Sequence, residues 1–316
     1  MSNRIKILSP IDRVEEISPL IKAGADEFYC GVLMNNMSLG TNRVASLESS
    51  NLLNLTELEK LVVIVKKQRK NIFLVLNVPF DSMKNFSVIE KNISKIEKIA
   101  PSAIIVGNIN LMNKLRNSRL DIIASSLLEA KNKETVRFLV EEFGVKKVIL
   151  ERQITLDDLD SIISEFPQIE FETFIMASGC RSLISSCKRR LVTDKKYLHI
   201  HLCTSSFLID KKNKNRYLDL EDKKIIADRL KMPMPSCGAC ALFQFKEYPI
   251  SSVKIVGRGF PTKNKIENVK FIRKALNILK KNYSQNKFYQ KVEYLFREVF
   301  GRKCEKRYCY YPHFFR

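Results

Sequence analysis

Short apolar runs that alternate with longer segments of helical periodicity constrain the fold of this chain more than any other feature. The runs are rich in Ile, Val, Leu and Phe and nearly continuous in hydrophobicity, as expected for parallel strands covered on both faces. They span residues 5–10, 27–32, 71–78, 103–108, 120–126, 146–152, 170–177 and 252–259. Eight such β/α units predict a (β/α)8 barrel of the TIM type, with a doubly wound open sheet as the alternative.

The helical segments carry end signals. Thr56 and Thr155 precede acidic first turns, and Gly24 and Gly144 follow helices as C-cap candidates. After the eighth run, residues 266–281 have the spacing of a final covering helix.

One connection is far longer than the others. About 75 residues separate the seventh run from the eighth, and they contain five of the eight cysteines. An insertion at the carboxyl end of a barrel strand lies where such enzymes place their chemistry. We therefore predict a barrel over residues 1–281 with a cysteine-rich insertion at 178–250, followed by a basic, aromatic tail at 282–316.

The net positive charge of the chain lies entirely in its C-terminal part. Residues 181–316 hold 32 Lys and Arg against 11 Asp and Glu, and this difference of 21 accounts for the whole net charge of +21. Such an asymmetry favours an anionic substrate or RNA as partner, although a solvated basic surface is the alternative. No uncharged apolar run reaches the roughly 18 residues of a membrane span, and the N-terminus does not resemble a signal peptide. A cytoplasmic protein without a membrane span is expected.

Clustered cysteines in a reducing compartment more often bind metal than form disulfides. The spacing C-x6-C-x15-C-x33-C-x2-C joins Cys180, Cys187, Cys203, Cys237 and Cys240. From spacing alone, structural zinc, a [4Fe–4S] cluster and unconnected thiols all remain open. Cys30 lies alone in an apolar run and is expected in the core. In the tail, Cys304 and Cys309 have only His313 nearby in sequence and are expected to be structural thiols.

The stretch ETFIMASGCRSLISSC, residues 172–187, resembles the signature of the U32 "collagenase-like" peptidase family. The matching positions are Glu172, Phe174, Ser178, Cys180 and Cys187, whereas Ala177, Gly179 and Ser185 depart from the pattern. The opening, ILSP followed by IKAGADEFYCGV, resembles the opening strands of that family. SVKIVGR at 252–258 resembles its KIEGR strand, with Val256 in place of the acid. The resemblance covers about residues 5–280.

The resemblance implies a barrel whose cysteines hold a [4Fe–4S] cluster, with Cys180, Cys187, Cys203 and Cys237 as ligands and Cys240 as a substitute for Cys237. Members of the family include oxygen-independent hydroxylases of RNA bases or of a quinone precursor. An iron–sulfur enzyme that hydroxylates RNA or a small anionic or aromatic substrate is therefore expected. A U32-type peptidase, or a non-catalytic cluster-bearing subunit with a homologous protein partner, is the alternative.

Polar residues at strand ends are the candidates for the rest of the site. They are Asn77, Ser125, Glu151 and Arg152 at the ends of their strands, Glu172 within the seventh strand, and Lys254 and Arg258 at the eighth. Lys254 and Arg258 are four residues apart, so strand alternation predicts that both face one cavity. Two cations there would suit an anionic substrate, whereas salt bridges to Glu151 or Glu172 are the alternative.

Overall fold

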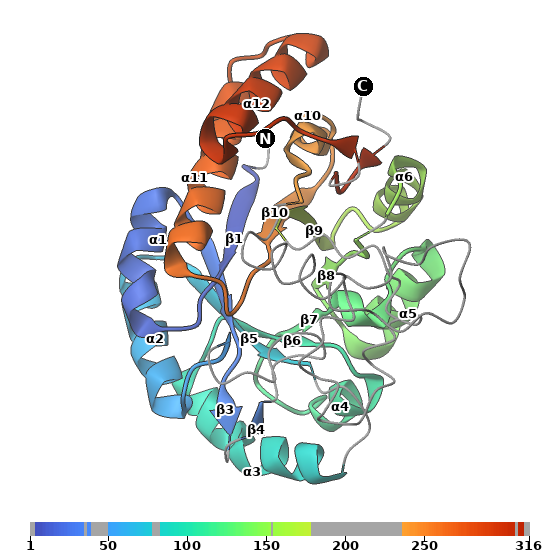
Figure 1. The fold of residues 1–316 in the computed structure, drawn as a ribbon. Coiled ribbons are helices and arrows are strands. Elements are labelled where there is room, and N and C mark those ends of the chain that lie inside the picture. The colour runs from blue at the N-terminus through green and yellow to red at the C-terminus, as the bar shows by residue number, and fades with distance from the viewer. Residues whose placement is uncertain are drawn as a thin grey trace, which may run out of the picture.

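The computed structural model describes residues 4–34, 37–38, 50–77, 83–152, 154–177, 236–306 and 309–312. Eight parallel strands close into a barrel in the order β1-β10-β9-β8-β7-β6-β5-β2 (Figure 1). This confirms the predicted (β/α)8 barrel, and the alternative prediction of a doubly wound open sheet is wrong. The barrel strands are β1 (Lys6–Pro10), β2 (Glu27–Cys30), β5 (Asn71–Leu76), β6 (Ala103–Val106), β7 (Ile122–Ala124), β8 (Lys147–Ile149), β9 (Glu170–Met176) and β10 (Ile250–Ile255).

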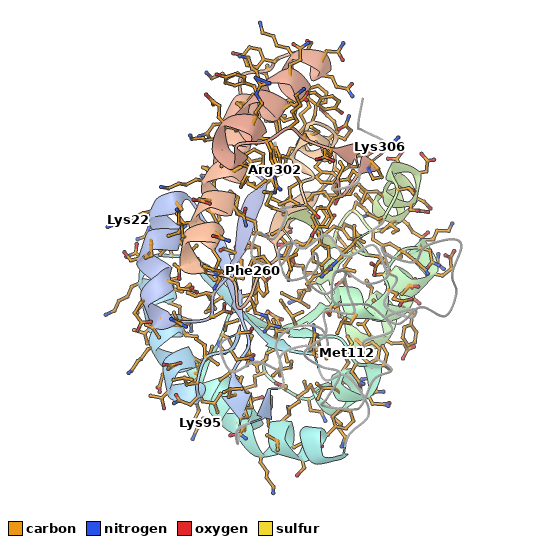
Figure 2. All side chains as sticks on the ribbon, in the orientation of Figure 1. Lys22, Lys95, Met112, Phe260, Arg302 and Lys306 are labelled. Atoms are coloured by element: carbon orange, nitrogen blue, oxygen red, sulfur yellow. The ribbon has the colours of Figure 1, made fainter. Side chains whose placement is uncertain are left out.

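Helices surround the barrel (Figure 1). They are α1 (Ile17–Ala23), α2 (Leu55–Lys67), α3 (Met83–Ile99), α4 (Ile109–Lys114), α5 (Lys133–Phe143), α6 (Leu156–Glu165), α10 (Leu242–Phe245), α11 (Thr262–Leu279) and α12 (Gln285–Phe300). Charged side chains such as Lys22 and Lys95 lie on the outside of this ring (Figure 2). A short hairpin, β3 (Leu33–Met34) with β4 (Met37–Ser38), follows β2.

The helix ends largely follow the sequence signals. Thr155 forms a capping box with Asp158 at the start of α6, and Gly24 and Gly144 end their helices with left-handed backbones. The signal at Thr56 is wrong, because Asn54 caps α2 by accepting a hydrogen bond from the backbone N–H of Glu57 at 3.0 Å. No helix within the described residues is long and apolar enough to cross a membrane.

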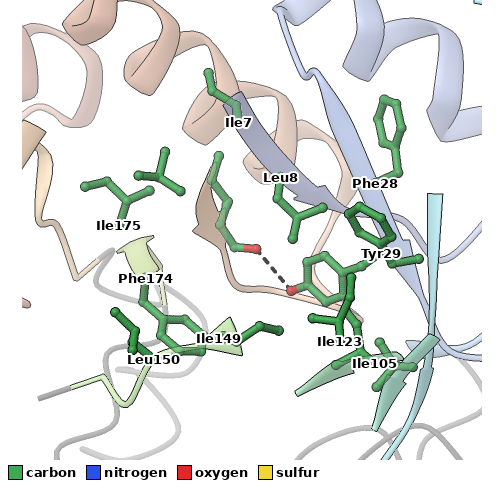
Figure 3. Packing of buried hydrophobic residues seen from close by; sticks show 14 of the residues in the cluster. Ile7, Leu8, Phe28, Tyr29, Ile105, Ile123, Ile149, Leu150, Phe174 and Ile175 are labelled. Atoms are coloured by element: carbon green, nitrogen blue, oxygen red, sulfur yellow. Dashed lines mark hydrogen bonds between the residues drawn. The ribbon is translucent and has the colours of Figure 1, made fainter. Parts of the chain in front are cut away.

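The apolar core consists of the barrel strands and the inner faces of the helices. Ile7, Leu8, Phe28 and Phe171 are all fully buried, and Figure 3 shows part of this packing. Between α11 and α12, Phe271 contacts Phe300 with ring centres 5.3 Å apart. Such burial is the main source of stability for a barrel of this kind.

The last described residues pack onto the barrel rather than extending from it. Tyr310 donates its hydroxyl to the carbonyl of Ala177, and Tyr311 donates to that of Phe174 at 2.8 Å. Both tyrosines are buried, so these two aromatic side chains of the tail belong to the packing against the barrel. The division of the chain at residue 281 stays a prediction.

Candidate functional site

The barrel interior contains a network of buried charged side chains. Glu172 on β9 accepts hydrogen bonds from Lys254 Nζ at 3.0 Å and from Ser252 Oγ at 3.1 Å, both on β10. Lys147 Nζ on β8 lies 3.2 Å from the Glu172 carboxylate and 3.4 Å from that of Glu27 on β2. Two lysines and two glutamates, all buried, thus neutralise each other inside the barrel.

Burial and ion pairing oppose each other in this network. Burial alone would raise the pKa of Glu172, but Lys254 and Lys147 hold that pKa below its usual value. Burial would lower the pKa of Lys147, but Glu172 and Glu27 raise it. For Lys254, burial outweighs Glu172 and lowers the pKa. Glu172 is therefore held as a carboxylate, and Lys254 is the more easily deprotonated of the two lysines.

Lys254 is paired within the barrel. Besides its salt bridge to Glu172, its ammonium lies 4.2 Å from the centre of the Tyr29 ring. Tyr29 donates its hydroxyl to the carbonyl of Ile255 at 3.0 Å (Figure 3). Of the two interpretations open for Lys254, the salt bridge to Glu172 is the one present. The rule of strand alternation does not reach Arg258, because β10 ends at Ile255.

Arg258 lies in the loop that leaves β10. The glycines on either side, Gly257 and Gly259, have φ angles of +130° and +79°, which side chains larger than glycine rarely adopt. The guanidinium reaches Gly31, which directly follows β2, and a Cβ on Gly31 would collide with both Arg258 and Asn51. Burial lowers the pKa of Arg258. The sequence GRG thus builds a loop that holds a buried cation at the carboxyl end of the barrel.

A second buried network holds this loop in place. Asp12, which follows β1, accepts a hydrogen bond from the backbone N–H of Gly259 at 2.6 Å. Lys265 on α11 bonds to Asp12 and, at 2.9 Å, to Glu16. Glu16 in turn accepts from Thr262 Oγ1 at 2.7 Å and from the backbone N–H of Asp12 at 2.9 Å. The sequence interpretation missed this network. The available signal was Asp12, an acidic residue two positions after the first strand.

Asn77 and Ser125 meet at the same end of the barrel. Asn77 follows β5 and donates from Nδ2 to the Oγ of Ser125, which follows β7, at 3.1 Å. Gly107 follows β6, between them, and a Cβ there would lie 2.7 Å from Asn77 Oδ1. That oxygen is buried and has no hydrogen-bond partner among the described residues. It is an acceptor suited to an N–H or O–H group of a ligand.

Glu151 and Arg152 follow β8. Glu151 is buried, and its backbone N–H bonds to the carbonyl of Ala130 at 3.1 Å. The guanidinium of Arg152 lies 4.6 Å from the centre of the Phe174 ring, a cation–π distance. Phe174 also stacks on Tyr310 with ring centres 6.4 Å apart. The sequence interpretation did not include Lys147, Tyr29 and Asp12 among the candidates. A charged or hydroxyl side chain in or beside an apolar run gives no local signal of which distant residue it contacts.

The structure separates the candidates into two levels. Glu172 and Lys254 lie on strands within the barrel, whereas Asn77, Glu151 and Arg258 lie just beyond the carboxyl ends of strands. Their catalytic roles stay predictions.

Cys237 lies against the end of β9. It pairs with Met176 in an antiparallel bridge, and the backbone N–H of Ala177 bonds to the carbonyl of Ser236 at 2.8 Å. The Cys237 thiol is buried, and burial raises its pKa. Cys180, Cys187 and Cys203 lie outside the described residues. Within the described part, no three Cys, His, Asp or Glu side chains form a ready metal-binding group.

The tail cysteines lie beside this segment. Cys237 pairs with Cys309 in a parallel bridge, and the backbone N–H of Tyr310 bonds to the carbonyl of Cys237 at 3.0 Å. Cys237, which is distant in sequence, is thus a spatial neighbour of Cys309, and the expectation that Cys304 and Cys309 are structural thiols stays a prediction. Cys30 is buried in the core as predicted.

Comparisons with known proteins identify relatives of this chain. It is 24% identical over 204 residues to "tRNA hydroxylation protein P" of Haemophilus influenzae, which covers 64% of this chain and 42% of that protein. It is 22% identical to "Collagenase" of Porphyromonas gingivalis over 72% of this chain and 56% of that protein. The chain thus spans about half the length of these curated relatives.

A solved structure and a family profile agree with these matches. "The Structure of the U32 Peptidase Mk0906" aligns with a TM-score of 0.51 at 12% identity, over 83% of this chain and 96% of the other, which supports the fold alone. The sequence profile of "Peptidase family U32" matches residues 12–314, nearly the whole chain. The chain belongs to peptidase family U32.

Proposed function

We propose that this protein is an RNA-modifying enzyme that hydroxylates a base, without oxygen, using a [4Fe–4S] cluster. Cys180, Cys187, Cys203 and Cys237 would hold the cluster. The proposal is supported by the family, by relatives described as tRNA hydroxylation proteins, and by the basic C-terminal half of the chain.

The position of Cys237 carries the proposal. Cys180 follows the last residue of β9 by four positions in the sequence. Cys237, from far along the chain, pairs with that same last residue, Met176. One proposed ligand therefore pairs with this strand end, on the side of the barrel where Arg258 and Asn77 also lie, and a second follows the strand by four residues in sequence. This is the end at which TIM-barrel enzymes act.

The donor set suits an iron–sulfur centre. Iron–sulfur clusters are held by cysteine thiolates, and a bound cluster would supply electron transfer or Lewis acidity. Burial favours the neutral thiol of Cys237, so the positive charge of a metal would be needed to hold the thiolate at this buried position.

The other residues at this end would bind and orient the substrate. Arg258 is a buried cation, and Arg152 adds a second beside the Phe174 ring; together they suit phosphates or the carboxylate of a small hydroxyl donor. Asn77 Oδ1 would accept a hydrogen bond from an N–H of a base.

A peptidase is the second candidate, favoured by relatives described as a collagenase and as an uncharacterised protease. A cysteine peptidase needs a thiol with a lowered pKa beside a histidine. Burial instead raises the pKa of Cys30, Cys237 and Cys240. All three histidines lie outside the described residues. A cluster-bearing subunit that lacks activity of its own is the third candidate.

The first experiment is iron and sulfide analysis of anaerobically purified protein. The proposal expects a brown protein with about four iron atoms per chain, and loss of iron in Cys180→Ser and Cys237→Ser. Cys30→Ala is the matched control and should keep its iron. A colourless wild-type protein without iron would refute the cluster.

The second experiment tests the substrate. RNA nucleosides from a strain lacking this gene should be missing a hydroxylated base, and the wild-type gene should restore it. Arg258→Ala should fail to restore the base although it retains iron. Unchanged nucleosides in the deletion strain would refute RNA as substrate. Peptide cleavage by the iron-free protein would favour the peptidase. Restoration of the base only in the presence of a homologous partner would favour the third candidate, a cluster-bearing subunit without activity of its own.

A further inference from the structure

The last two helices carry an excess of positive charge. Residues 262–306, which comprise α11, α12 and the segment that follows them, contain 13 Lys and Arg against four Glu, a net charge of +9. Two of these cations are used inside the fold, where Lys265 bonds to Asp12 and Arg273 bonds to Asp26. Of the other eleven, nine are exposed. The excess therefore lies on the surface of the molecule.

Lysines follow one line along α11. Lys263, Lys270 and Lys274 are separated by seven and four residues, so they lie on the same face of a helix with 3.6 residues per turn. All three are exposed, and Lys281 continues the line in the turn where α11 ends. The three helical positions span about 17 Å, at a rise of about 1.5 Å per residue. Glu267, which is half-buried, is the acidic residue on this line.

The line of lysines begins beside the proposed site. α11 starts four residues after Arg258, and its first residue, Thr262, bonds to Glu16 of the network that holds the Arg258 loop. α11 lies on the outside of the barrel with α12 beside it (Figure 1), and Phe271 contacts Phe296 with ring centres 5.7 Å apart. A molecule bound along α11 would therefore extend to the carboxyl end of the barrel.

A cluster of lysines lies where the two helices join. The ammonium groups of Lys287 and Lys291, on the first turns of α12, both lie 5.0 Å from the centre of the Tyr283 ring. Two further lysines lie in the connection at residues 280–284. Among the residues that the structure describes, no carboxylate forms a salt bridge with any of these four lysines. Like charges one helical turn apart repel each other, so a bound anion would stabilise the cluster.

An exposed aromatic side chain lies on the same face of α12. Tyr294 is 62% exposed and follows Lys287 and Lys291 by seven and three residues. The opposite, apolar face of this helix is buried, with Phe288 and Phe296 in the core. The exposed face of α12 therefore presents cations and an aromatic ring rather than a continuous apolar surface.

We propose that this surface binds the phosphate backbone of an RNA, with Tyr294 as a platform for a base. The surface, called the basic face below, consists of Lys263, Lys270, Lys274, Lys281, Lys287 and Lys291. RNA as the partner rests on the proposed function, and the docking surface, which lies outside the barrel mouth, goes beyond it.

The residue types favour RNA over other anionic partners. Lysine is a flexible point charge, and contacts to phosphates fix the position of a nucleic acid without reading its sequence. Bases stack on aromatic side chains in proteins that bind single strands. Lysine is depleted in protein–protein interfaces. A helix that lies on a membrane needs an exposed apolar face, and the apolar face of α12 is buried.

Binding of a fluorescent RNA stem–loop to the full chain, measured by anisotropy at a series of salt concentrations, tests the basic face. Lys270→Gln/Lys274→Gln/Lys281→Gln keeps long side chains that favour a helix, and should weaken binding by at least about 10-fold near 0.1 M salt. The slope of log affinity against log salt should fall by about 2–3, because each phosphate contact contributes about 0.7–0.9.

The matched control removes the same charge elsewhere. Lys60→Gln/Lys66→Gln/Lys67→Gln changes three exposed lysines of α2 and should alter neither the affinity nor the slope. Glu298→Gln removes an exposed carboxylate one turn beyond Tyr294 and should strengthen binding. Tyr294→Ala should weaken binding by about 5-fold or more, whereas Tyr294→Phe should bind as the wild type does.

A measurement on the wild type covers the case in which a variant fails to fold. Acetylation of lysines, followed by mass spectrometry, should be slower at Lys270 and Lys274 when the RNA stem–loop is bound. Acetylation of Lys60 and Lys66 should proceed at the same rate with and without RNA.

Several outcomes would overturn the proposal. Equal loss of affinity in the α11 and α2 variants would mean that net charge alone explains binding. Full RNA affinity in the α11 variant, or a wild type that binds phosphatidylserine vesicles or poly-glutamate but not RNA, would also overturn it. Lysine-dependent RNA binding with unchanged nucleosides in the deletion strain would refute only the proposed function. A missing base in that strain, with RNA binding independent of these lysines, would refute only the docking surface.

Discussion

The buried charges of the barrel interior make a sharp prediction about Glu172. In Glu172→Gln the shape of the side chain is kept, but Lys147 and Lys254 lose the carboxylate that lies 3.2 Å and 3.0 Å from them. Glu27, which also pairs with Lys6 at 3.0 Å, remains as the only carboxylate of the network, so the two buried lysines lose half of the negative charge beside them. We expect a loss of stability without a change of fold.

The magnitude follows from the contacts. Both lysines lose a charged acceptor, and a hydrogen bond to a charged group is worth about 1.5–3 kcal/mol. Removing one partner of a buried ion pair costs about 3–5 kcal/mol, because a charge is left uncompensated. We therefore expect Glu172→Gln to lower the free energy of unfolding by about 3–5 kcal/mol. Lys254→Met should lower the free energy of unfolding by less. Burial already disfavours the charge of Lys254, and Glu172 still has Lys147 as an ion-pair partner in this variant.

Denaturant unfolding at neutral pH measures both variants and the double variant. Because the two side chains interact directly, their effects should not add, and the double variant should be more stable than the sum predicts by about 1–3 kcal/mol. The pair Lys114–Glu90 is the matched control. It has a similar distance of 2.6 Å but is solvent-exposed, so its coupling should stay below about 1 kcal/mol.

The pH dependence supplies an independent check. The folded-state pKa of Glu172 is lowered, so its contribution to stability is complete above the unfolded pKa of about 4.3 and is lost as pH falls through the folded value. The difference between wild type and Glu172→Gln should therefore shrink in acid below that pH. A difference under about 1 kcal/mol at neutral pH, or strictly additive effects, would refute the reasoning and indicate well-hydrated charges.

Four further predictions concern single residues. Lys265→Met leaves two carboxylates buried beside each other and should cost about 3–5 kcal/mol in denaturant unfolding. Gly31→Ala places a Cβ against Arg258 and should cost about 1–3 kcal/mol in the same assay. Thr155→Ala removes the cap of α6 and should lower the free energy of unfolding in urea by about 1 kcal/mol, whereas Thr155→Ser should be nearly neutral. Tyr311→Phe loses its hydroxyl contacts to the barrel and should lower the thermal midpoint by the equivalent of about 1–3 kcal/mol.

The order of the strands was predictable because parallel strands are buried on both faces and leave continuous apolar runs. Each of the eight predicted runs overlaps a barrel strand, and only β10 begins before its predicted run, at Ile250 rather than residue 252. The runs extend past the strand ends, as at Asn77 and Gly107, because residues leaving a barrel strand remain partly buried. Helix starts were less certain: Asn54 and Thr56 are both capping residues, and only the backbone decides between them.

The site was less predictable because it depends on contacts between distant segments. Lys147 lies in a predicted strand run. Nothing in its local sequence indicates that its charge is compensated by Glu27, 120 residues away, and by Glu172, 25 residues away. Cys309 meets Cys237 through a backbone pairing over a long separation. Spacing rules apply to ligands on one local motif, so they could not join the tail to the insertion.

The pairing of β1 with β10 has a consequence for how this protein is made. Leu8 pairs with Lys254, and Gly259 and Lys265 bond to Asp12 across 247 and 253 residues of chain. A ribosome releases β1 long before its neighbour exists, so the strand waits with an unpaired edge until most of the chain has been translated. Folding of such a long-range contact is slow, and the open edge invites pairing with other chains. The edge of β1 that pairs with β10 therefore stays open until the last barrel strand has emerged.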